Sequence, residues 1–264
     1  MEVKVFERVH PREYFNLFSE KGIRPDGRSL TGSRKTAVRV GSIRTALGSA
    51  MVKCGSTTML CGTTAKVINP TGAKVEFAPI DVNVELLPLC SAKYRPGRKP
   101  EESYHLQELV AQHVRRLVQP SSLELEFEDM MWSLSLDIYC LEDDGNMDDA
   151  TLLVAMAALK DTRLPEILSS EEGYHVTKSR TRTVDFRELI VPVSFGVVDS
   201  RVVVDPDSSE EALCESKVTI FVDEKGSFRG LSKSGGSVTS KDLLSTCSKL
   251  AVQRAPALFS QLSN

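Results

Sequence analysis

The chain has 264 residues, of which 41% are apolar and 26% are charged, and this is the balance of an ordinary globular protein. Its 33 Lys and Arg residues and 36 Asp and Glu residues give a formal net charge of −3. This composition excludes disorder, a collagen-like repeat and a coiled coil as the dominant state, and any contact with nucleic acid must use a local basic patch. The N-terminus has no apolar core of signal-peptide length, and the longest apolar run, residues 152–159, is too short to span a bilayer. We expect a soluble intracellular protein.

The first half of the chain alternates predicted strands with predicted helices. Pro11 opens a short amphipathic helix over residues 11–20, and Arg-Pro-Asp-Gly-Arg at 24–28 is typical of a turn. Apolar alternation and turn residues predict a meander of three strands and then a fourth strand, at residues 36–43, 49–54, 57–68 and 80–87. A basic loop at 90–100 precedes a helix at 104–118, a strand at 132–141 and a strongly apolar helix at 147–159.

The second half repeats this order of strands followed by a helix. The predicted hairpins are residues 189–197 with 201–204 around Asp199-Ser200, and residues 218–222 with 228–232 around Glu224-Lys225-Gly226. The final helix spans 238–259, where Thr239 and Asp242 resemble a capping box. We therefore expect an α+β fold of two pseudo-repeated halves, each with antiparallel strands before a helix, joined across Pro165–Glu172. The expected domains are an N-terminal helix and turn (1–30), a first half (31–168) and a second half with the last helix (169–264).

Most catalytic and metal-binding motifs are missing from the sequence. It contains no G-x-S-x-G, no G-x-x-x-x-G-K-[ST] and no G-x-G-x-x-G. Its six cysteines form no C-x-x-C pair and lie in apolar surroundings, which is typical of reduced core thiols. The four histidines form no H-x-x-x-H pair, so we expect neither a metal site nor a cofactor.

An acidic cluster at residues 142–149 has two interpretations. Its carboxylates could ligate a divalent cation, since hard cations prefer oxygen; they are Glu142, Asp143, Asp144, Asp148 and Asp149. Alternatively, Asp148 and Asp149 occupy the first turn of a helix, where the macrodipole stabilises acids, and the preceding acids form a solvated turn. The second interpretation is the more common one. Two carboxylates at a helix N-terminus also repel the phosphate that a bare N-terminus would bind.

A basic loop carries four positive charges in seven residues, Lys93, Arg95, Arg98 and Lys99. Such a loop can bind a phosphate backbone while the ring of Tyr94 stacks on a base, and Arg115 and Arg116 could extend the patch. A solvated loop rim is the equally weighted alternative.

Two further features favour structural roles. The alternating charges Lys178, Arg180, Arg182 and Arg187 are typical of an exposed edge strand that is protected by charge. Gly235-Gly236-Ser237 could approach a phosphate, but a loop leading into the last helix is the commoner meaning.

Short segments spread over roughly residues 20–255 share an order and a spacing that are specific when taken together. They are Arg24–Arg28 (RPDGR), Gly48–Ala50, Gly55–Thr58, Pro88–Arg98, Asp144–Asn146 with Asp149-Ala150, Leu164-Pro165, Val204–Pro206 with Glu210-Glu211, and Gly235-Gly236. In this order they resemble the RNase PH family, and within it the RNase PH-like subunits of the RNA exosome ring.

The resemblance implies a fold, an assembly and an activity. The fold is two similar α+β halves of the ribosomal S5 domain 2 type. Family members assemble into six-membered rings around a pore that admits single-stranded RNA. Active members use inorganic phosphate to remove nucleotides from an RNA 3′ end and release nucleoside diphosphates.

Departures from the active pattern imply that catalysis is lost. Active members hold the attacking phosphate with an Arg and a Thr at a helix N-terminus, where this chain has Asp148 and Asp149 within a degenerate site, Asn146, Met147, Asp148 and Asp149. Two like charges ~4 Å apart repel by about 4 kcal/mol at an effective dielectric of ~20, which exceeds the ~0.3–1 kcal/mol that the macrodipole offers. Of the family's acidic pair, Asp205 matches the first member. The second falls in Cys214–Lys217, where Glu215 is the only carboxylate.

We therefore expect a structural subunit of a eukaryotic exosome ring, with no catalytic residues of its own. It would complete a heterohexamer with other RNase PH-like subunits and with cap subunits that carry RNA-binding domains, partly through edge strands, and would have no membrane partner. In this role it would support RNA processing, including that of rRNA, and degradation in the nucleus, nucleolus and cytoplasm. The segment Leu89-Cys90-Ser91 is most similar to a eukaryotic non-catalytic subunit. Single-stranded RNA would meet Arg95, Arg98, Lys99, Arg115 and Arg116.

Two other functions stay open. An active phosphorolytic 3′–5′ exoribonuclease would release nucleoside diphosphates when phosphate is present, and Asp148 and Asp149 argue against it. A metal-dependent hydrolytic nuclease would use the Asp143–Asp149 cluster and would cleave RNA without phosphate.

Overall fold

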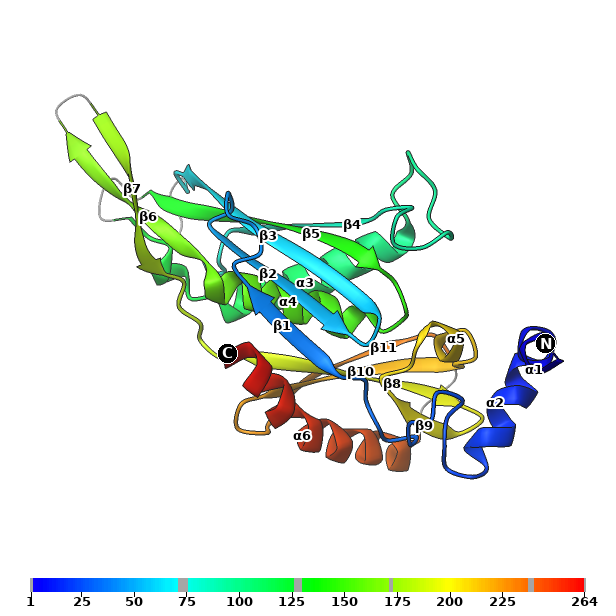
Figure 1. The fold of residues 1–264 in the computed structure, drawn as a ribbon. Coiled ribbons are helices and arrows are strands. Elements are labelled where there is room, and N and C mark those ends of the chain that lie inside the picture. The colour runs from blue at the N-terminus through cyan, green and yellow to red at the C-terminus, as the bar shows by residue number, and fades with distance from the viewer. Residues whose placement is uncertain (1, 71–75, 126–129, 171–172, 237–239, 264) are drawn as a thin grey trace. The chain divides into compact units, whose positions relative to one another are not determined.

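The computed structural model describes residues 2–70, 76–125, 130–170, 173–236 and 240–263, which form two compact units (Figure 1). The first unit combines Met1–Lys35, Asp144–Asp149 and Ile190–Phe259, and the second combines Thr36–Asp143, Ala150–Leu189 and Ser260–Asn264. Within the described ranges, no helix combines the length and the apolar character that a membrane crossing requires. The domain boundaries expected at residues 30 and 168 stay a prediction.

The second unit contains a five-stranded sheet with the order β1-β2-β3-β5-β4. Its antiparallel meander is confirmed: β1 (Thr36–Val40), β2 (Gly48–Cys54) and β3 (Thr57–Ile68) pair in sequence. β5 (Met131–Glu142) adds to β3 in antiparallel fashion, but β4 (Ile80–Leu86) is parallel to β5. This parallel pair was not predicted, and the helix between β4 and β5 acts as the crossover that parallel neighbours need.

Two helices lie beside this sheet (Figure 1). α3 (Glu101–Leu117) buries one apolar face, made of Leu106, Leu109, Val110, Val114 and Leu117. The backbone N–H of Ala78 donates to the carbonyl of Arg115 at 3.1 Å and fixes the end of α3 beside the start of β4. α4 (Met147–Asp161) is buried throughout residues 150–159, as its uniformly apolar sequence predicts. A short 3₁₀ turn, η1 (Pro120–Ser122), follows α3.

A second, two-stranded sheet corrects the predicted linker. β6 (Arg163–Ser170) pairs in antiparallel fashion with β7 (Gly173–Thr183), so residues 165–170 are a strand, and residues 171–172 lie outside the described residues. Arg180 on β7 is exposed and donates to the carbonyl of Ala46 at 2.8 Å. A charged, exposed strand therefore exists here, although Arg187 lies beyond its end and the side chain of Lys178 is outside the described part.

The first unit contains a four-stranded sheet with the order β11-β10-β8-β9. Both predicted hairpins are confirmed: β8 (Ile190–Val198) with β9 (Arg201–Val204), and β10 (Ser216–Asp223) with β11 (Phe228–Ser234). Asp199 and Ser200 adopt the left-handed φ values of 45° and 62° that a two-residue hairpin turn requires. α6 (Lys241–Ser263) buries Cys247, Ala251, Ala255 and Leu258 along one stripe. The predicted start of this helix, with the capping box at Thr239, lies outside the described residues.

The N-terminal segment packs on the β8–β9 hairpin. α1 (Glu2–Val9) was not predicted, whereas α2 (Pro11–Ser19) was, and its Phe15 forms a buried cluster with Val198 and Val203. The side chain of Arg24, in the RPDGR turn, is fully buried. It donates to the carbonyls of Ser29, Leu30 and Gly32 at 3.0, 2.8 and 2.7 Å, to the carbonyl of Val204, and to Glu210 at 3.1 Å. The hydrogen bonds of Arg24 therefore join this turn to the rest of the unit.

Candidate functional site

The turn before α4 is held in a conformation that few residues adopt. Gly145 and Asn146 have φ values of 76° and 52°. A Cβ at Gly145 would lie 2.6 Å from both Asp207 C and Ser208 N, at the start of α5 (Ser208–Glu211). Glycine is therefore required at residue 145 for space as well as for φ. The turn therefore fixes where the first residues of α4 lie against the loop that leads into α5.

Asp149 is fully buried and is bound to β8. Its carboxylate accepts hydrogen bonds from the backbone N–H of Ser194 at 3.1 Å, from the Ser194 hydroxyl at 2.7 Å and from the amide of Asn146 at 2.9 Å. Burial raises the pKa of Asp149, although the charge of Arg254 and these hydrogen bonds oppose the rise. The Asp149 carboxylate is therefore engaged in hydrogen bonds within this unit.

Asp205 is the anionic centre of the same cluster. It has a left-handed φ of 51° and a side chain with no exposed area. Its oxygens accept the backbone N–H of Arg34 at 2.7 Å, Arg34 Nη2 at 2.8 Å and Asn146 Nδ2 at 2.6 Å, and Arg254 Nη2 lies 3.7 Å away. Burial alone would raise the pKa, but the hydrogen bonds and charges of Arg34, with the charge of Arg254, lower it to about 2.

Asp148 is held by Lys217, which also binds Glu211. The Lys217 ammonium lies 3.1 Å from Asp148 and donates to Glu211 Oε1 at 2.8 Å, and the same oxygen accepts the backbone N–H of Asn146 at 2.9 Å. Burial would lower the pKa of Lys217, but the two carboxylates prevail and raise it. Lys217 therefore stays charged, and that charge is used internally.

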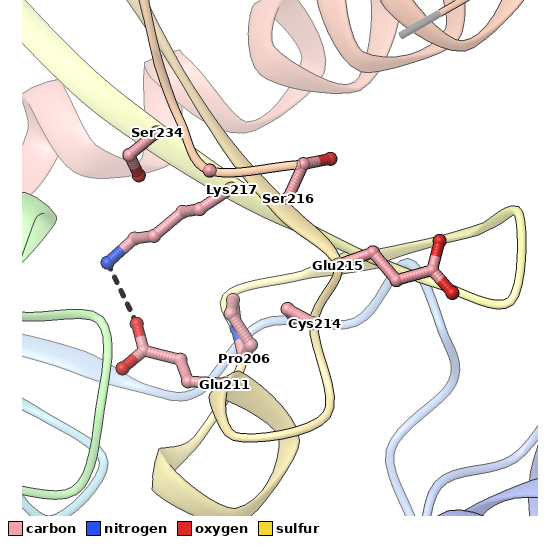
Figure 2. A pocket seen from close by; sticks show the side chains of 8 residues that line it. Pro206, Glu211, Cys214, Glu215, Ser216, Lys217 and Ser234 are labelled. Atoms are coloured by element: carbon pink, nitrogen blue, oxygen red, sulfur yellow. Dashed lines mark hydrogen bonds and ion pairs between the residues drawn. The ribbon is translucent and has the colours of Figure 1, made fainter. Parts of the chain in front are cut away.

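A pocket of about 270 Å³ opens beside this ion pair (Figure 2). Lys217 and Glu211 meet in it, while the carboxylate of Glu215 points elsewhere. The remaining lining residues are Pro206, Cys214, Ser216, Ser234 and Gly235. Gly236, next along the chain, has a φ of 63°, and a Cβ there would lie 2.1 Å from the carbonyl oxygen of Glu215. Close backbone packing explains the glycine at 236 without a ligand.

The cations of this cluster are already paired with carboxylates. Carboxylates outnumber cations, and Arg34, Arg254 and Lys217 each lie within 4 Å of a carboxylate oxygen. An incoming phosphate at ~4 Å from one uncompensated carboxylate would be repelled by about 4 kcal/mol at an effective dielectric of ~20. The N-terminus of α4 thus carries carboxylate side chains at the position where a helix N-terminus would otherwise bind an anion.

The acidic residues do not assemble into a metal centre. In the part of the chain that the structure describes, no three His, Cys, Asp or Glu side chains are grouped to hold a metal ion. Asp143 accepts from the Tyr94 hydroxyl at 3.2 Å and pairs with Lys93 at 2.8 Å, while Asp148 and Asp149 are engaged as described above. The six cysteines, all within the described ranges, form no disulfide, and five of them are buried.

The basic loop differs from its prediction in two respects. Tyr94 is only 4% exposed, so it is not available to stack on a base. Lys99 donates to Asn83 Oδ1 at 2.9 Å and to Gln107 Oε1 at 2.8 Å, so its ammonium braces the loop against β4 and α3. Arg95 and Arg98 are exposed and form no ion pair with any residue in the described ranges. They are the free charges of the loop.

Arg115 and Arg116 do not extend this patch. They lie in the last turn of α3, whereas the loop precedes its first turn, and 17 helical residues span about 25 Å. Arg115 donates to the carbonyl of Ile80 at 2.8 Å, and the guanidinium of Arg116 lies 6.0 Å from the ring centre of Phe77. The five predicted RNA-binding residues therefore form two separate groups.

Both halves of the chain match one protein family. Residues 32–165 match domain 1 of the 3′ exoribonuclease family, RNase PH, and residues 188–254 match its domain 2. The chain belongs to the RNase PH family. The RNase PH fold, with two domains of mixed α and β structure, is confirmed.

The RNase PH relatives include components of archaeal exosomes. The chain is 33% identical to exosome complex component Rrp42 of Aeropyrum pernix over 237 residues, which cover 88% of this chain and 86% of that protein. It is 31% identical to Rrp42 of Methanothermobacter thermautotrophicus over 242 residues, covering 90% and 89%. A chain of the Archaeoglobus fulgidus exosome with RNA bound to the active site is 29% identical, with a TM-score of 0.80 and coverage of 95% and 96%. A chain of an archaeal exosome core is 26% identical, with a TM-score of 0.78 and full coverage of both chains.

The structure separates two acidic residues near the cluster, and which of them matches the family's second acid stays a prediction. Glu215, within the range expected for the second acid, pairs with Arg12 at 3.7 Å, whereas Glu211 lies beside Asn146 and Lys217. A capping box formed by Asp207 and Glu210 starts α5 at Ser208, and Glu211 is the last residue of this short helix.

Proposed function

We propose that this chain is a non-catalytic, Rrp42-like subunit of the hexameric RNA exosome ring. It supports 3′–5′ RNA processing and degradation by completing the ring and helping to form the pore that admits RNA. The identity with proteins named exosome complex component Rrp42, over nearly the whole chain, supports this assembly. The likeness to a chain of an exosome with bound RNA supports the RNA-related role.

The non-catalytic part of the proposal rests on the carboxylates around the start of α4. Asp149 is bound to Ser194, Asp148 to Lys217 and Asp205 to Arg34, at distances of 2.7–3.1 Å. Two cations of the cluster, Lys217 and Arg34, are thereby paired with carboxylates. Phosphorolysis needs a site where a phosphate can stand in line with the scissile bond, and carboxylates at the start of α4 support the proposal that this site is lost.

The partners we propose are other RNase PH-like subunits in a heterohexamer and cap subunits with RNA-binding domains, in a eukaryotic exosome of the nucleus, nucleolus and cytoplasm. The similarity of Leu89-Cys90-Ser91 to a eukaryotic non-catalytic subunit supports the finer assignment. β11 is an edge of its sheet, and its Phe228 and Leu231 are exposed. An edge of this kind can continue the sheet of a neighbouring subunit.

We propose that RNA phosphates meet Arg95 and Arg98, since these guanidinium groups are exposed and unpaired within the described residues. Lys99 adds its charge while it braces the loop. Arg115 and Arg116 form a second, separate contact at the other end of α3.

A phosphorolysis assay tests the non-catalytic assignment. The purified full chain, incubated with an RNA oligonucleotide and inorganic phosphate, should release no nucleoside diphosphate. Incorporated into the reconstituted complex, a Lys217→Met variant should leave the rate of phosphorolysis or hydrolysis unchanged, with ring integrity checked by native mass spectrometry. Phosphate-dependent release by the chain alone, or its loss in an intact ring that carries Lys217→Met, would instead establish the active exoribonuclease.

A further inference from the structure

An exposed tyrosine stands where the basic loop enters α3. Tyr104, in the first turns of the helix, is 58% exposed, in contrast to the buried Tyr94 of the loop. It lies off the apolar face that Leu106, Leu109 and Val110 present to the core. Burying an aromatic ring in the core stabilises a fold, whereas a ring that stays in solvent is available to a binding partner.

The ring of Tyr104 lies beside a fixed charge. Lys99 Nζ is 5.3 Å from the ring centroid, and that ammonium is held in place by Asn83 and Gln107. A cation at this distance attracts the ring face and limits its motion. The side chain is therefore pre-positioned before any partner arrives, which reduces the entropy lost on binding.

The free charges of the loop, Arg95 and Arg98, lie a few residues before this ring in the sequence. Arg95 and Arg98 are exposed on either side of Gly97, whose φ of 83° turns the chain between them. Lys93 is neutralised by Asp143. Glu101 and Glu102 at the start of α3 are exposed acids. Together with Arg95, Arg98 and Lys99 they leave a net positive charge. An aromatic ring on which a base can stack, combined with cations that meet the phosphates, is the arrangement that binds single-stranded nucleic acids.

We propose that Tyr104 is a stacking platform for a base of single-stranded RNA, and that Arg95 and Arg98 hold the adjoining phosphates. This inference rests on the proposed exosome function and names the contact that the buried Tyr94 cannot make. Because every base has a π face, the contact accepts purines and pyrimidines alike, and it requires unpaired bases. Leu89, which is 77% exposed, would suit a protein partner, and the experiment separates that outcome.

The test is RNA binding by the reconstituted complex, measured by fluorescence anisotropy with labelled oligo(A) and oligo(U) over a series of salt concentrations. Tyr104→Ala should weaken binding of both oligonucleotides about tenfold without changing the salt dependence, and Tyr104→Phe should retain the affinity. The double variant Arg95→Gln, Arg98→Gln should lower the slope of log K against log salt by about 1.4, at ~0.7 for each phosphate contact to a single strand. Phe6→Ala, an exposed aromatic in α1, is the matched control and should leave binding unchanged.

Three results would overturn the inference or its basis. Unchanged RNA affinity of Tyr104→Ala in an intact ring removes the stacking role and leaves the ring assignment standing. Loss of a protein subunit from the complex with that variant identifies a protein contact instead. If the wild-type chain enters no ring, the proposed function itself fails.

Discussion

Replacing Asp205 by asparagine should destabilise the protein in a pH-dependent way. Both carboxylate oxygens face only N–H donors: Oδ2 accepts the backbone N–H of Arg34, and Oδ1 accepts Arg34 Nη2 and Asn146 Nδ2. The amide NH₂ of Asp205→Asn must therefore point at a donor. The substitution also leaves the nearby charges of Arg34 and Arg254 without their buried anion.

The lowered pKa sets the scale of the effect. A fall from the ordinary 3.8 to about 2 corresponds to about 2 kcal/mol of stability from the charge alone, at ~1.4 kcal/mol per pKa unit. Because the folded-state pKa is depressed, this stability is fully present above about pH 4 and is lost as the pH falls through about 2. The donor–donor contact adds to the loss at neutral pH.

Asp149 provides a matched contrast in the same cluster. Oδ2 accepts from Ser194 N and Asn146 Nδ2, and Oδ1 accepts from the Ser194 hydroxyl, which also lies 2.7 Å from Thr219 Oγ1. In Asp149→Asn the new carbonyl can replace Oδ2, and the NH₂ can donate to Ser194, whose hydroxyl then donates to Thr219. Burial disfavours the charge at Asp149, so losing it removes a penalty at neutral pH. We expect a change of less than about 1 kcal/mol.

Urea unfolding followed by circular dichroism at pH 7 and at pH 3 measures both variants. We expect Asp205→Asn to lose at least about 2 kcal/mol at pH 7 and distinctly less at pH 3, with Asp149→Asn close to wild type at pH 7. An Asp205→Asn deficit that is equal at the two pH values would refute the electrostatic reasoning. So would an Asp149→Asn variant that is the less stable of the two at pH 7.

Two other substitutions test the rigid parts of this unit. Arg24→Met should cost about 3–5 kcal/mol in urea unfolding, because it removes the buried guanidinium that pairs with Glu210 at 3.1 Å and leaves that buried carboxylate with the more distant Arg28, at 3.5 Å; a loss below about 1 kcal/mol would contradict this role. Gly145→Ala should be clearly more harmful than Gly41→Ala in the midpoint of thermal unfolding. Both glycines have φ near 70°, but an added Cβ meets Asp207 C at 2.6 Å in the first and nothing within 4 Å in the second. Equal losses would show that backbone strain alone sets the cost.

Local sequence signals located most elements but not their partners. Alternating apolar residues and the Asp199-Ser200 turn predict the β8–β9 hairpin, since pairing there depends on adjacent residues. The parallel pairing of β4 with β5 depends on where α3 returns the chain, which no local pattern encodes. The polar segment around Ser169 was mistaken for a linker because β6 is an element of a small exposed hairpin, with little apolar alternation to reveal it.

The sequence indicated which residues belong to the site, but it did not indicate which residues they contact. Asp148 and Asp149 follow from the helix start, but the partners that neutralise the cluster come from β8 and β10, far along the chain. Tyr94 and Tyr104 are the same residue type, and the sequence does not show which of them is buried; in the fold, Tyr94 is buried and Tyr104 is exposed. Helical periodicity offered one missed hint, since Tyr104 lies off the apolar face of its own helix.

Native mass spectrometry of the tagged chain, isolated gently from its own cells, tests the central claim most directly. We expect one copy of this chain in a complex with several different proteins of RNase PH size. A homohexamer would contradict the scaffold assignment. It would restore the phosphorolytic enzyme and require phosphate to bind beside Asp148 and Asp149.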